Sequence, residues 1–236
     1  MLTSRFDMCN AFEARNIKYI LFDLDGTISD SAPGIVKSVA YALDKLGVKY
    51  ESSESLRRFV GPPLREEFMK YCGFGLDDGN RAVDLYREYY TVKGIYENSM
   101  YPGIPEMLAV LCKKGYTLAV ATSKPEKFAR DILGRYICPE SMKSVVEMFA
   151  FVGGSEMNGD RTDKSEVIKY VVKNLGENVT PEECVMVGDR EHDILGAKKN
   201  GMRSIGVLWG YGGKEELENA GADVIVSSAC ELSETL

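Results

Sequence analysis

The sequence predicts an α/β fold, a doubly wound parallel-sheet (Rossmann-like) core with an all-helical segment inserted after its first strand. From about residue 100 onward, short apolar segments rich in Val and Ala alternate mostly with segments of helical spacing. These apolar segments are continuous rather than alternating, which is typical of strands buried on both faces of a parallel sheet. Residues from roughly 32 to 99 instead show helical spacing and no convincing strand.

The core elements are expected in a regular order along the chain. The first strand is KYILFDLD, which begins at Lys18. Later strands are expected in YTLAVAT, MFAFVGG, ECVMVGD, SIGVLW and DVIVSS, and helices in IPEMLAVLCKK, PEKFARDILGRY, DKSEVIKYVVKNL, DILGAKKNG and KEELENA. This alternation is typical of the βαβ units that build a doubly wound sheet.

The insert contains three candidate helices, in PGIVKSVAYALDKLG, LREEFMKYCGF and NRAVDLYREYYTVKGIYEN. The Pro- and Gly-containing segment YPGIP then returns the chain to the core. We therefore expect an α/β core formed by residues 1–31 and 100–236, and a helical cap domain formed by residues 32–99.

Composition limits the partners and the compartment. A net charge of −7 argues against nucleic acid polymers, whose phosphate backbones are bound by basic surfaces. No apolar run approaches the roughly 20 residues that span a bilayer, and the N-terminus lacks the apolar region of a signal peptide. The six cysteines are scattered without a disulfide-like framework. We expect a soluble cytoplasmic protein with no membrane partner, and the sequence leaves its oligomeric state open.

The scarcity of histidine narrows the possible chemistry. His192 is the only histidine, so zinc sites built on several histidines are excluded, as are Ser-His-Asp arrangements away from His192. The chain also lacks the glycine-rich motifs of dinucleotide-binding and P-loop proteins.

Polar residues follow the ends of four predicted strands. They are Asp23 and Asp25, then Thr122 and Ser123, then Arg161 and Lys164, and finally Asp189, Glu191 and Asp193. Because the carboxyl ends of parallel strands meet at one edge, we expect these side chains in one crevice. Three or four carboxylates, a lysine and a helix N-terminus together favour a site for Mg²⁺ and a phosphate group.

Taken singly, these residues also have plainer interpretations. Ser123 could have no role beyond capping the following helix, because SKPE matches a capping box with proline near the helix start. Lys164 could be a solvated surface lysine, although the first turn of a helix disfavours a cation. Asp189 could be a loop acid and Asp193 a helix cap. The combination of all four strand ends favours a site.

The same residues resemble those of the haloacid dehalogenase-like hydrolases, in particular the phosphoglycolate phosphatase group with a small helical cap. The resemblance extends from about Lys18 to the final strand. The motifs DLDGT and GDREHDILGAK carry it, and ATSKP and the Lys164 segment follow in the same order.

The resemblance implies a phosphatase that forms an aspartyl-phosphate. Asp23 would be the nucleophile and a Mg²⁺ ligand, and Asp25 the general acid/base that also offers its backbone carbonyl to the metal. Dehalogenating members lack the second aspartate of the first motif, so Asp25 favours phosphate chemistry. A carboxylate nucleophile divides phosphate hydrolysis into two easier steps.

The resemblance also gives roles to the other strand ends. Thr122 and the Ser123 amide would hold phosphoryl oxygens, and Lys164 would bridge the phosphate and the nucleophile. Asp189, with Asp193 close behind, would anchor the metal.

The resemblance implies a small phosphate monoester as the substrate, and the sequence leaves its identity open. A phosphoglycolate phosphatase is the first expectation, and a 5′-nucleotidase, an inorganic pyrophosphatase and a sugar phosphomutase are the alternatives. Arg57, Arg58 and Arg65 lie around a Gly-Pro-Pro turn, and at least one of them, with Arg58 and Arg65 the chosen candidates, could bind a substrate carboxylate. The aromatic residues of the insert could stack on a nucleobase, but they more often form the core of a helical bundle. Outside enzymes, a receiver-type signalling domain also uses an aspartyl-phosphate, but it needs neither a lid nor Asp25.

Overall fold

The computed structural model describes residues 17–236, so the expectations about the N-terminal segment and Cys9 lie outside the described residues. Contacts divide the chain into two compact units. The first unit combines the residues up to Ile28 with Met100–Leu236, and the second unit is Ser29–Ser99. The assignment of the second unit as a cap stays a prediction.

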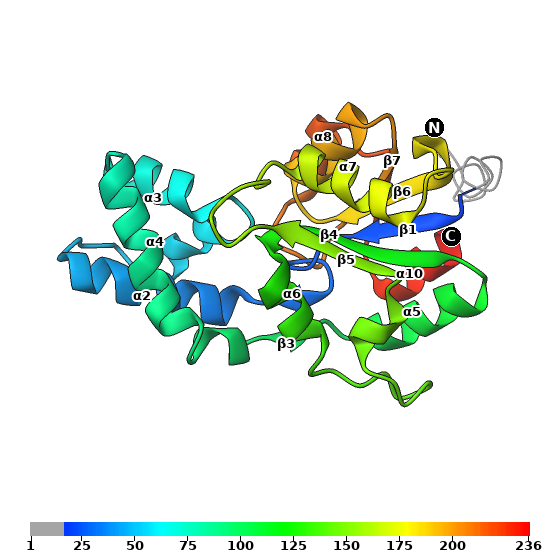
Figure 1. Cartoon of the computed structure of the whole chain (residues 1–236), viewed down its shortest axis with the longest axis horizontal. Coiled ribbons are helices and arrows are strands. Elements are labelled where there is room, and N and C mark those ends of the chain that lie inside the picture. The colour runs from blue at the N-terminus through cyan, green and yellow to red at the C-terminus, as the bar shows by residue number, and fades with distance from the viewer. Residues whose placement is uncertain (1–16) are drawn as a thin grey trace. The chain divides into compact units, whose positions relative to one another are not determined.

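The first unit contains a six-stranded parallel sheet (Figure 1). Its strands, in spatial order, are β5 (Phe151–Ser155), β4 (Thr117–Pro125), β1 (Tyr19–Phe22), β6 (Cys184–Gly188), β7 (Arg203–Val207) and β8 (Val224–Val226). Every neighbouring pair is parallel. The chain builds outward from β1 in one direction and then returns to build in the other, which confirms the predicted doubly wound sheet.

Strand β1 is central because its sequence suits burial on both faces. Ile20, Leu21 and Phe22 are all completely buried. Tyr19 to Phe22 pair with residues 117–120 of β4 on one side and 184–187 of β6 on the other. The reversal of strand order therefore lies between β1 and β6, and a doubly wound sheet binds its ligand outside the carboxyl ends of the strands at such a point.

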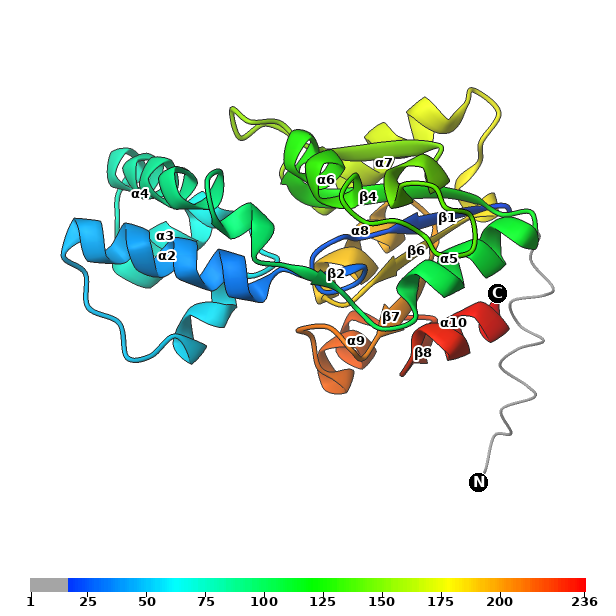
Figure 2. The same ribbon diagram turned by 90° about the horizontal axis from the view of Figure 1, so that it is seen from below.

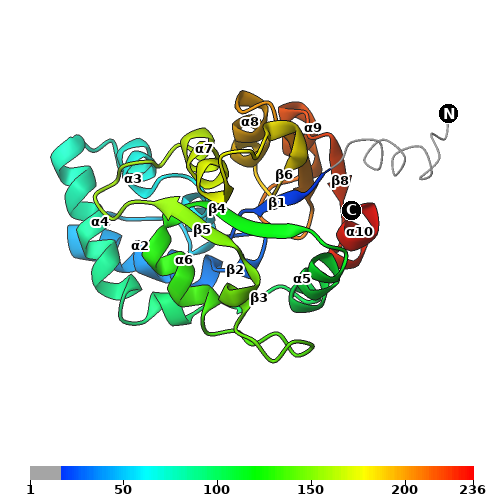
Figure 3. The ribbon, with the colours of Figure 1, turned by 45° about the vertical axis from the view of Figure 1, so that its right-hand side comes forward.

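Helices cover both faces of this sheet. Helices α7 (Lys164–Leu175) and α8 (Glu191–Lys199) lie on one face and α5 (Ile104–Lys113), α6 (Glu126–Leu133) and α10 (Ala229–Thr235) on the other, as Figures 1 and 3 show. Helix α9 (Lys214–Ala220) packs against α8, and α10 packs against α5. The first unit also contains two short 3₁₀ helices, Val145–Met148 and Pro181–Glu183. Among the described residues, no helix is long and apolar enough to cross a membrane.

The second unit is a small helical bundle. Its elements are α2 (Ala32–Leu46), a 3₁₀ helix (Glu54–Phe59), α3 (Leu64–Cys72), α4 (Leu76–Tyr90) and a second 3₁₀ helix (Gly94–Tyr96). Helices α2 and α4 lie side by side (Figure 2). The short strands β2 (Ser29–Asp30) and β3 (Ser99–Met100) pair where the chain enters and leaves this unit.

Aromatic side chains form much of the bundle core. Phe59 packs against Phe68 with ring centroids 4.8 Å apart, and Tyr86 stacks on Tyr90 at 5.2 Å. All four residues are buried. This confirms the interpretation of these aromatic residues as packing groups within the bundle.

Candidate active site

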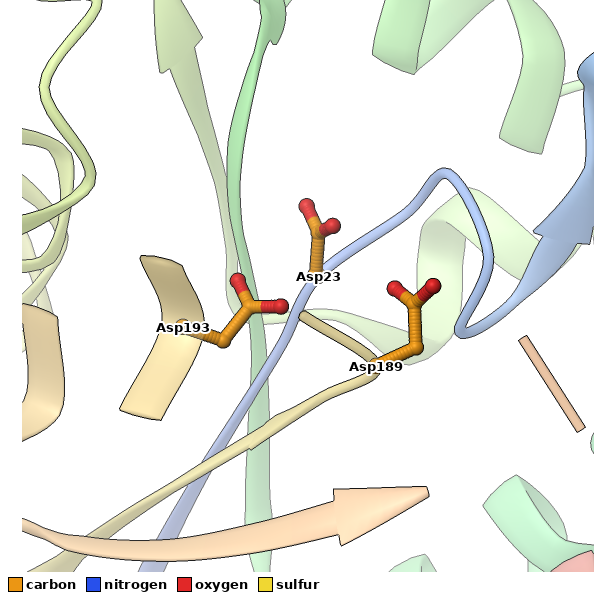
Figure 4. A group of neighbouring side chains, drawn as sticks. All are labelled: Asp23, Asp189 and Asp193. Carbon is orange, nitrogen blue, oxygen red and sulfur yellow. The ribbon is translucent and has the colours of Figure 1, made fainter. Parts of the chain in front are cut away.

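Three carboxylates converge at the point where the strand order reverses. Asp23 directly follows β1, Asp189 directly follows β6, and Asp193 lies in the first turn of α8. Figure 4 shows the three side chains facing a common space, and each offers an oxygen within 4.8 Å of the others. All three are buried. The fold therefore concentrates like charges at one place, at a cost that a cation would offset.

Lys164 supplies one positive charge to this group. Its Nζ lies 2.7 Å from Asp23 Oδ1 and 2.8 Å from Asp193 Oδ1, and it donates to the carbonyl of Ala121 at 3.1 Å. The residue is only 6% exposed, so the interpretation as a solvated lysine is wrong. Burial lowers the pKa of Lys164, but the adjacent Asp193 and Asp23 carboxylates outweigh it and raise the pKa above its usual value.

Asp25 contacts a second lysine, Lys124, which no local sequence pattern identifies as a site residue. Lys124 Nζ donates to Asp25 Oδ2 at 2.7 Å, and both residues are buried. This pair is balanced in charge, whereas Asp23, Asp189 and Asp193 with Lys164 leave two negative charges when all are ionised. One divalent cation would neutralise them.

The pKa values of Asp189 and Asp193 support the same conclusion. Burial raises the pKa of Asp189 well above its usual range, and the Asp193 and Asp23 charges raise it further. Burial also raises the pKa of Asp193, and the opposing effect of Lys164 is too small to reverse the shift. Both groups are therefore poorly compensated by the protein alone.

Two oxygens in this group are aimed into the shared space without a hydrogen bond. Asp23 Oδ1 and Asp193 Oδ1 are buried, and although each lies within ion-pairing distance of Lys164, neither accepts a well-formed hydrogen bond. Hard cations such as Mg²⁺ prefer carboxylate oxygens. The residues present therefore fit a divalent metal ion.

A glycine-rich loop after β7 fixes the position of Asp189. Tyr211 donates its backbone N–H to Asp189 Oδ2 at 2.7 Å, and Thr27 Oγ1 donates to Oδ1 at 3.3 Å. Trp209 Nε1 donates to the carbonyl of Thr27 at 2.9 Å, so the loop also holds the turn after β1. A Cβ at Gly210 would lie 2.3 Å from the Cβ of Asp189, which only glycine avoids.

The pairing of β4 with β5 is irregular at the carboxyl end of β4. Ala121 pairs with Gly153 and Pro125 with Ser155, so four steps along β4 match two along β5. The extra residues include Thr122, which is buried, and Ser123, which is half-buried. Bulges of this kind are common next to active sites because they redirect the backbone.

The interpretation of Ser123 as a helix cap is wrong. Helix α6 begins at Glu126 and its N-cap position is occupied by Pro125, while Ser123 remains in extended β4. The Ser123 hydroxyl instead donates to the carbonyl of Thr162 at 3.1 Å. This contact ties the end of β4 to the loop that precedes Lys164.

Other residues near the predicted strand ends point elsewhere. The guanidinium of Arg161 lies 3.6 Å from the ring centroid of Tyr170 and donates to the carbonyl of Gly154. Glu191 and His192 are exposed on α8. Asp193 does cap, because its Oδ2 accepts from the Arg190 N–H at 3.1 Å while Oδ1 faces Lys164.

Within the helical unit, the two candidate arginines already have acidic partners. Arg58 donates to Glu67, which is buried, and its guanidinium lies 5.3 Å from the ring centroid of Tyr71. Arg65 donates to Glu66 at 3.1 Å. A substrate carboxylate would have to compete with these glutamates.

Comparison with known proteins agrees with this geometry. The family model of haloacid dehalogenase-like hydrolases matches residues 20–207. A 5′-nucleotidase of Pseudomonas aeruginosa is 44% identical over 84% of this chain and 86% of its own length. The tyrosine-protein kinase PtkA of Mycobacterium tuberculosis is 36% identical over 92% of this chain and 72% of its own length. A phosphoglycolate phosphatase of Vibrio parahaemolyticus is 28% identical over 94% of this chain and 97% of its own.

A solved structure supports the same relationship. The crystal structure of a predicted phosphatase from Clostridium acetobutylicum is 44% identical and has a TM-score of 0.85, covering 92% of this chain and 97% of its own. Fold, motif order and relatives agree. The chain therefore belongs to the haloacid dehalogenase-like hydrolases, among which it is a phosphatase.

Proposed function

We propose that this protein is a Mg²⁺-dependent phosphatase that hydrolyses a small phosphate monoester through an aspartyl-phosphate on Asp23. The observation that carries the proposal is the buried group of Asp23, Asp189 and Asp193, whose ligand oxygens lie within 4.8 Å of one another beside Lys164. Such a group of carboxylates is expensive to bury without a cation to offset its charge.

The metal would be held by these three aspartates and by the backbone carbonyl of Asp25. Mg²⁺ prefers oxygen ligands in octahedral geometry and usually leaves positions for water and a substrate phosphate. When bound, it would supply positive charge to the transferring phosphoryl group.

In the first half of the reaction, an Asp23 carboxylate oxygen attacks phosphorus. The bond between phosphorus and the ester oxygen breaks, and that oxygen takes a proton from Asp25 as the alcohol leaves. In the second half, water attacks the same phosphorus and gives its proton to Asp25. The bond to Asp23 then breaks, which restores both carboxyl groups and releases phosphate.

The remaining site residues would act on the phosphoryl oxygens. Thr122 and the Ser123 amide would donate to them from the irregular end of β4, and Lys164 would balance the negative charge shared by nucleophile and phosphate. Groups fixed in a water-poor site stabilise developing charge more strongly than solvent does.

Two substrate classes have specific support. The 44% identical relative named 5′-nucleotidase favours nucleoside 5′-monophosphates, and the 28% identical relative named phosphoglycolate phosphatase favours phosphoglycolate. The arginines that would bind a carboxylate are paired with Glu67 and Glu66. We therefore place nucleoside 5′-monophosphates ahead of phosphoglycolate, which reverses the order expected from the sequence.

A panel of phosphate esters tests both the activity and the substrate. Phosphate release is measured for nucleoside 5′-monophosphates, phosphoglycolate, a sugar phosphate, pyrophosphate and p-nitrophenyl phosphate, with Mg²⁺ and after exhaustive chelation. We expect turnover that requires Mg²⁺ and a preference for one monoester class. Unchanged activity after chelation would overturn the metal mechanism, and a lack of turnover on every ester would overturn the activity itself.

A further inference from the structure

Lys124, one member of a buried ion pair in the active-site unit, has no role in the chemistry described above. Lys124 Nζ donates to Asp25 Oδ2 at 2.7 Å, and the two side chains are only 5% and 10% exposed. Lysine is almost never buried without a reason, because its rotational freedom and hydration are both lost. The partner of Lys124 is the carboxylate to which we assign both proton transfers.

The backbone around Lys124 is arranged to hold it there. It lies within the irregular part of β4, between Ala121 and Pro125. Its N–H donates to Thr122 Oγ1 at 3.3 Å. Across the sheet, a Cβ at Gly154 would lie 2.4 Å from the carbonyl oxygen of Lys124, so glycine there lets the two strands approach. Lys124 is thus fixed at both its backbone and its ammonium group.

The second lysine of the site is placed differently. Lys164 contacts Asp23 and Asp193, the residues assigned to the nucleophile and the metal, from the first turn of α7. Lys124 contacts Asp25 from β4. The two lysines therefore serve separate carboxylates, and the loss of one is not compensated by the other.

We propose that Lys124 is a positioning residue that holds the Asp25 carboxyl group in the orientation required for proton transfer. The inference rests on the proposed function, because it assigns the proton transfers to Asp25. A carboxylate can rotate about two side-chain bonds, and a charge-assisted bond to one oxygen restricts both rotations. Asp25 then meets the ester oxygen and the attacking water from a fixed direction.

The expected consequence is a defect in turnover and not in substrate binding. A displacement of about 1 Å at a catalytic group can reduce the rate by about 10²-fold. Lys124→Met should therefore lower kcat by about 10²-fold on an alkyl phosphate with little change in KM. Lys124→Arg, which keeps the charged hydrogen bond, should recover part of the loss. Lys127→Met, at an exposed position on α6, should behave as the unchanged protein.

A double-mutant cycle with Asp25→Asn separates positioning from a merely structural role. If Lys124 acts through Asp25, Lys124→Met should slow the Asp25→Asn enzyme no further. The double variant also lacks a buried unpaired charge, so it serves as the well-folded comparison if Lys124→Met alone is unstable. The increase in unfolding temperature on adding Mg²⁺ shows that each variant retains its metal site.

The outcomes are distinguishable. Additive losses in the cycle, or an unchanged kcat for Lys124→Met, would overturn the positioning role while leaving the phosphatase mechanism intact. A loss in kcat that Asp25→Asn fails to reproduce would instead overturn the role of Asp25 itself. Non-additive losses with partial rescue by arginine would establish the proposal.

Discussion

The ammonium of Lys164 lies 2.7 Å from the carboxylate of Asp23, which joins the first turn of α7 to the end of the first strand. The two residues are far apart in sequence and both are buried. We expect Lys164→Met to abolish turnover and, in the absence of metal, to destabilise the fold by about 3–5 kcal/mol, because removing one partner leaves buried charge uncompensated. Steady-state kinetics and chemical denaturation measure the two effects.

The matched control for this variant is Lys169→Met, because Lys169 is exposed on the same helix. It should change neither kcat nor stability by a comparable amount. Full activity in Lys164→Met would show that the phosphoryl charge is balanced by another group.

The two aspartates after β1 should differ in their response to amide substitution. Asp23→Asn should abolish every step, since an amide is a poor nucleophile and a neutral metal ligand. Asp25→Asn should slow alkyl phosphates by roughly 10²–10⁴-fold, the usual value of general acid–base help. With p-nitrophenyl phosphate, whose leaving group needs no proton, Asp25→Asn should give a burst of p-nitrophenol and trap phosphate on the protein.

Rapid-quench kinetics and hydroxylamine treatment of the quenched protein detect the burst and the acyl phosphate. If the Asp25→Asn variant shows neither the burst nor the acyl phosphate, while it still binds Mg²⁺ and unfolds cooperatively, then Asp25 is not the general acid/base.

Metal binding should stabilise the protein more strongly as the pH rises. Burial raises the pKa values of Asp189 and Asp193, so the folded metal-free protein holds protons that the unfolded chain would release. The stability that these two groups contribute is therefore fully present below their unfolded pKa and is lost as the pH rises through the raised folded values. Mg²⁺ binds the ionised form and offsets this loss.

Thermal unfolding with and without Mg²⁺, at mildly acidic and mildly alkaline pH, measures this linkage. The metal-induced rise in Tm should be larger at the alkaline pH, and it should nearly vanish in Asp189→Asn. An equal rise at both pH values would show that the folded, metal-free site holds no extra protons.

Gly210→Ala should weaken metal binding without replacing any of the aspartates proposed to bind the metal. The added Cβ would lie 2.3 Å from the Cβ of Asp189, so either the loop or Asp189 must move. We expect a higher Mg²⁺ concentration for half-maximal activity. Gly213→Ala is the control, because a Cβ there meets nothing within 4 Å and its φ of −91° is open to other residues. Equal effects of the two substitutions would argue against close packing as the cause.

The helical unit provides a test of substrate choice. If Arg58 or Arg65 binds a substrate carboxylate, its replacement by alanine should raise KM for phosphoglycolate more than for p-nitrophenyl phosphate, which has no carboxylate. Arg81→Ala serves as the comparison, since Arg81 is exposed on helix α4 of the same unit and does not lie beside the Gly-Pro-Pro turn. Equal changes for both substrates would leave the arginines with a purely structural role in the bundle.

The sequence predicts the sheet well because a strand that is buried on both faces is a continuous run of apolar residues. Each continuous apolar run, such as that of β1 or β6, became a strand. Helix α10 escaped prediction because ACELSET is short and carries little apolar periodicity. The end of β4 was misplaced because SKPE has the local pattern of a helix cap, whereas pairing with β5 keeps it extended.

The missed parts of the site depend on contacts between distant segments. The role of Lys124 is set by Asp25, 99 residues earlier. The need for glycine at Gly210 arises only when the loop after β7 packs on Asp189. Neither requirement has a local sequence signature. Asp23 and Asp189 were detectable because each directly follows an apolar strand.

The central position of β1 sets the order in which the protein can be completed on the ribosome. Strand β1 is synthesised first, but its partners β4 and β6 begin only at Thr117 and Cys184. The helical unit, Ser29–Ser99, is continuous in sequence and emerges between them. The helical unit can therefore form its internal contacts in the nascent chain before either neighbouring strand of β1 has been synthesised. The proposed metal site forms late in synthesis, because Asp193, the last of its three carboxylates, follows β6. A chain truncated before α8 would therefore carry Asp23 and Asp189 but lack the third carboxylate of the site.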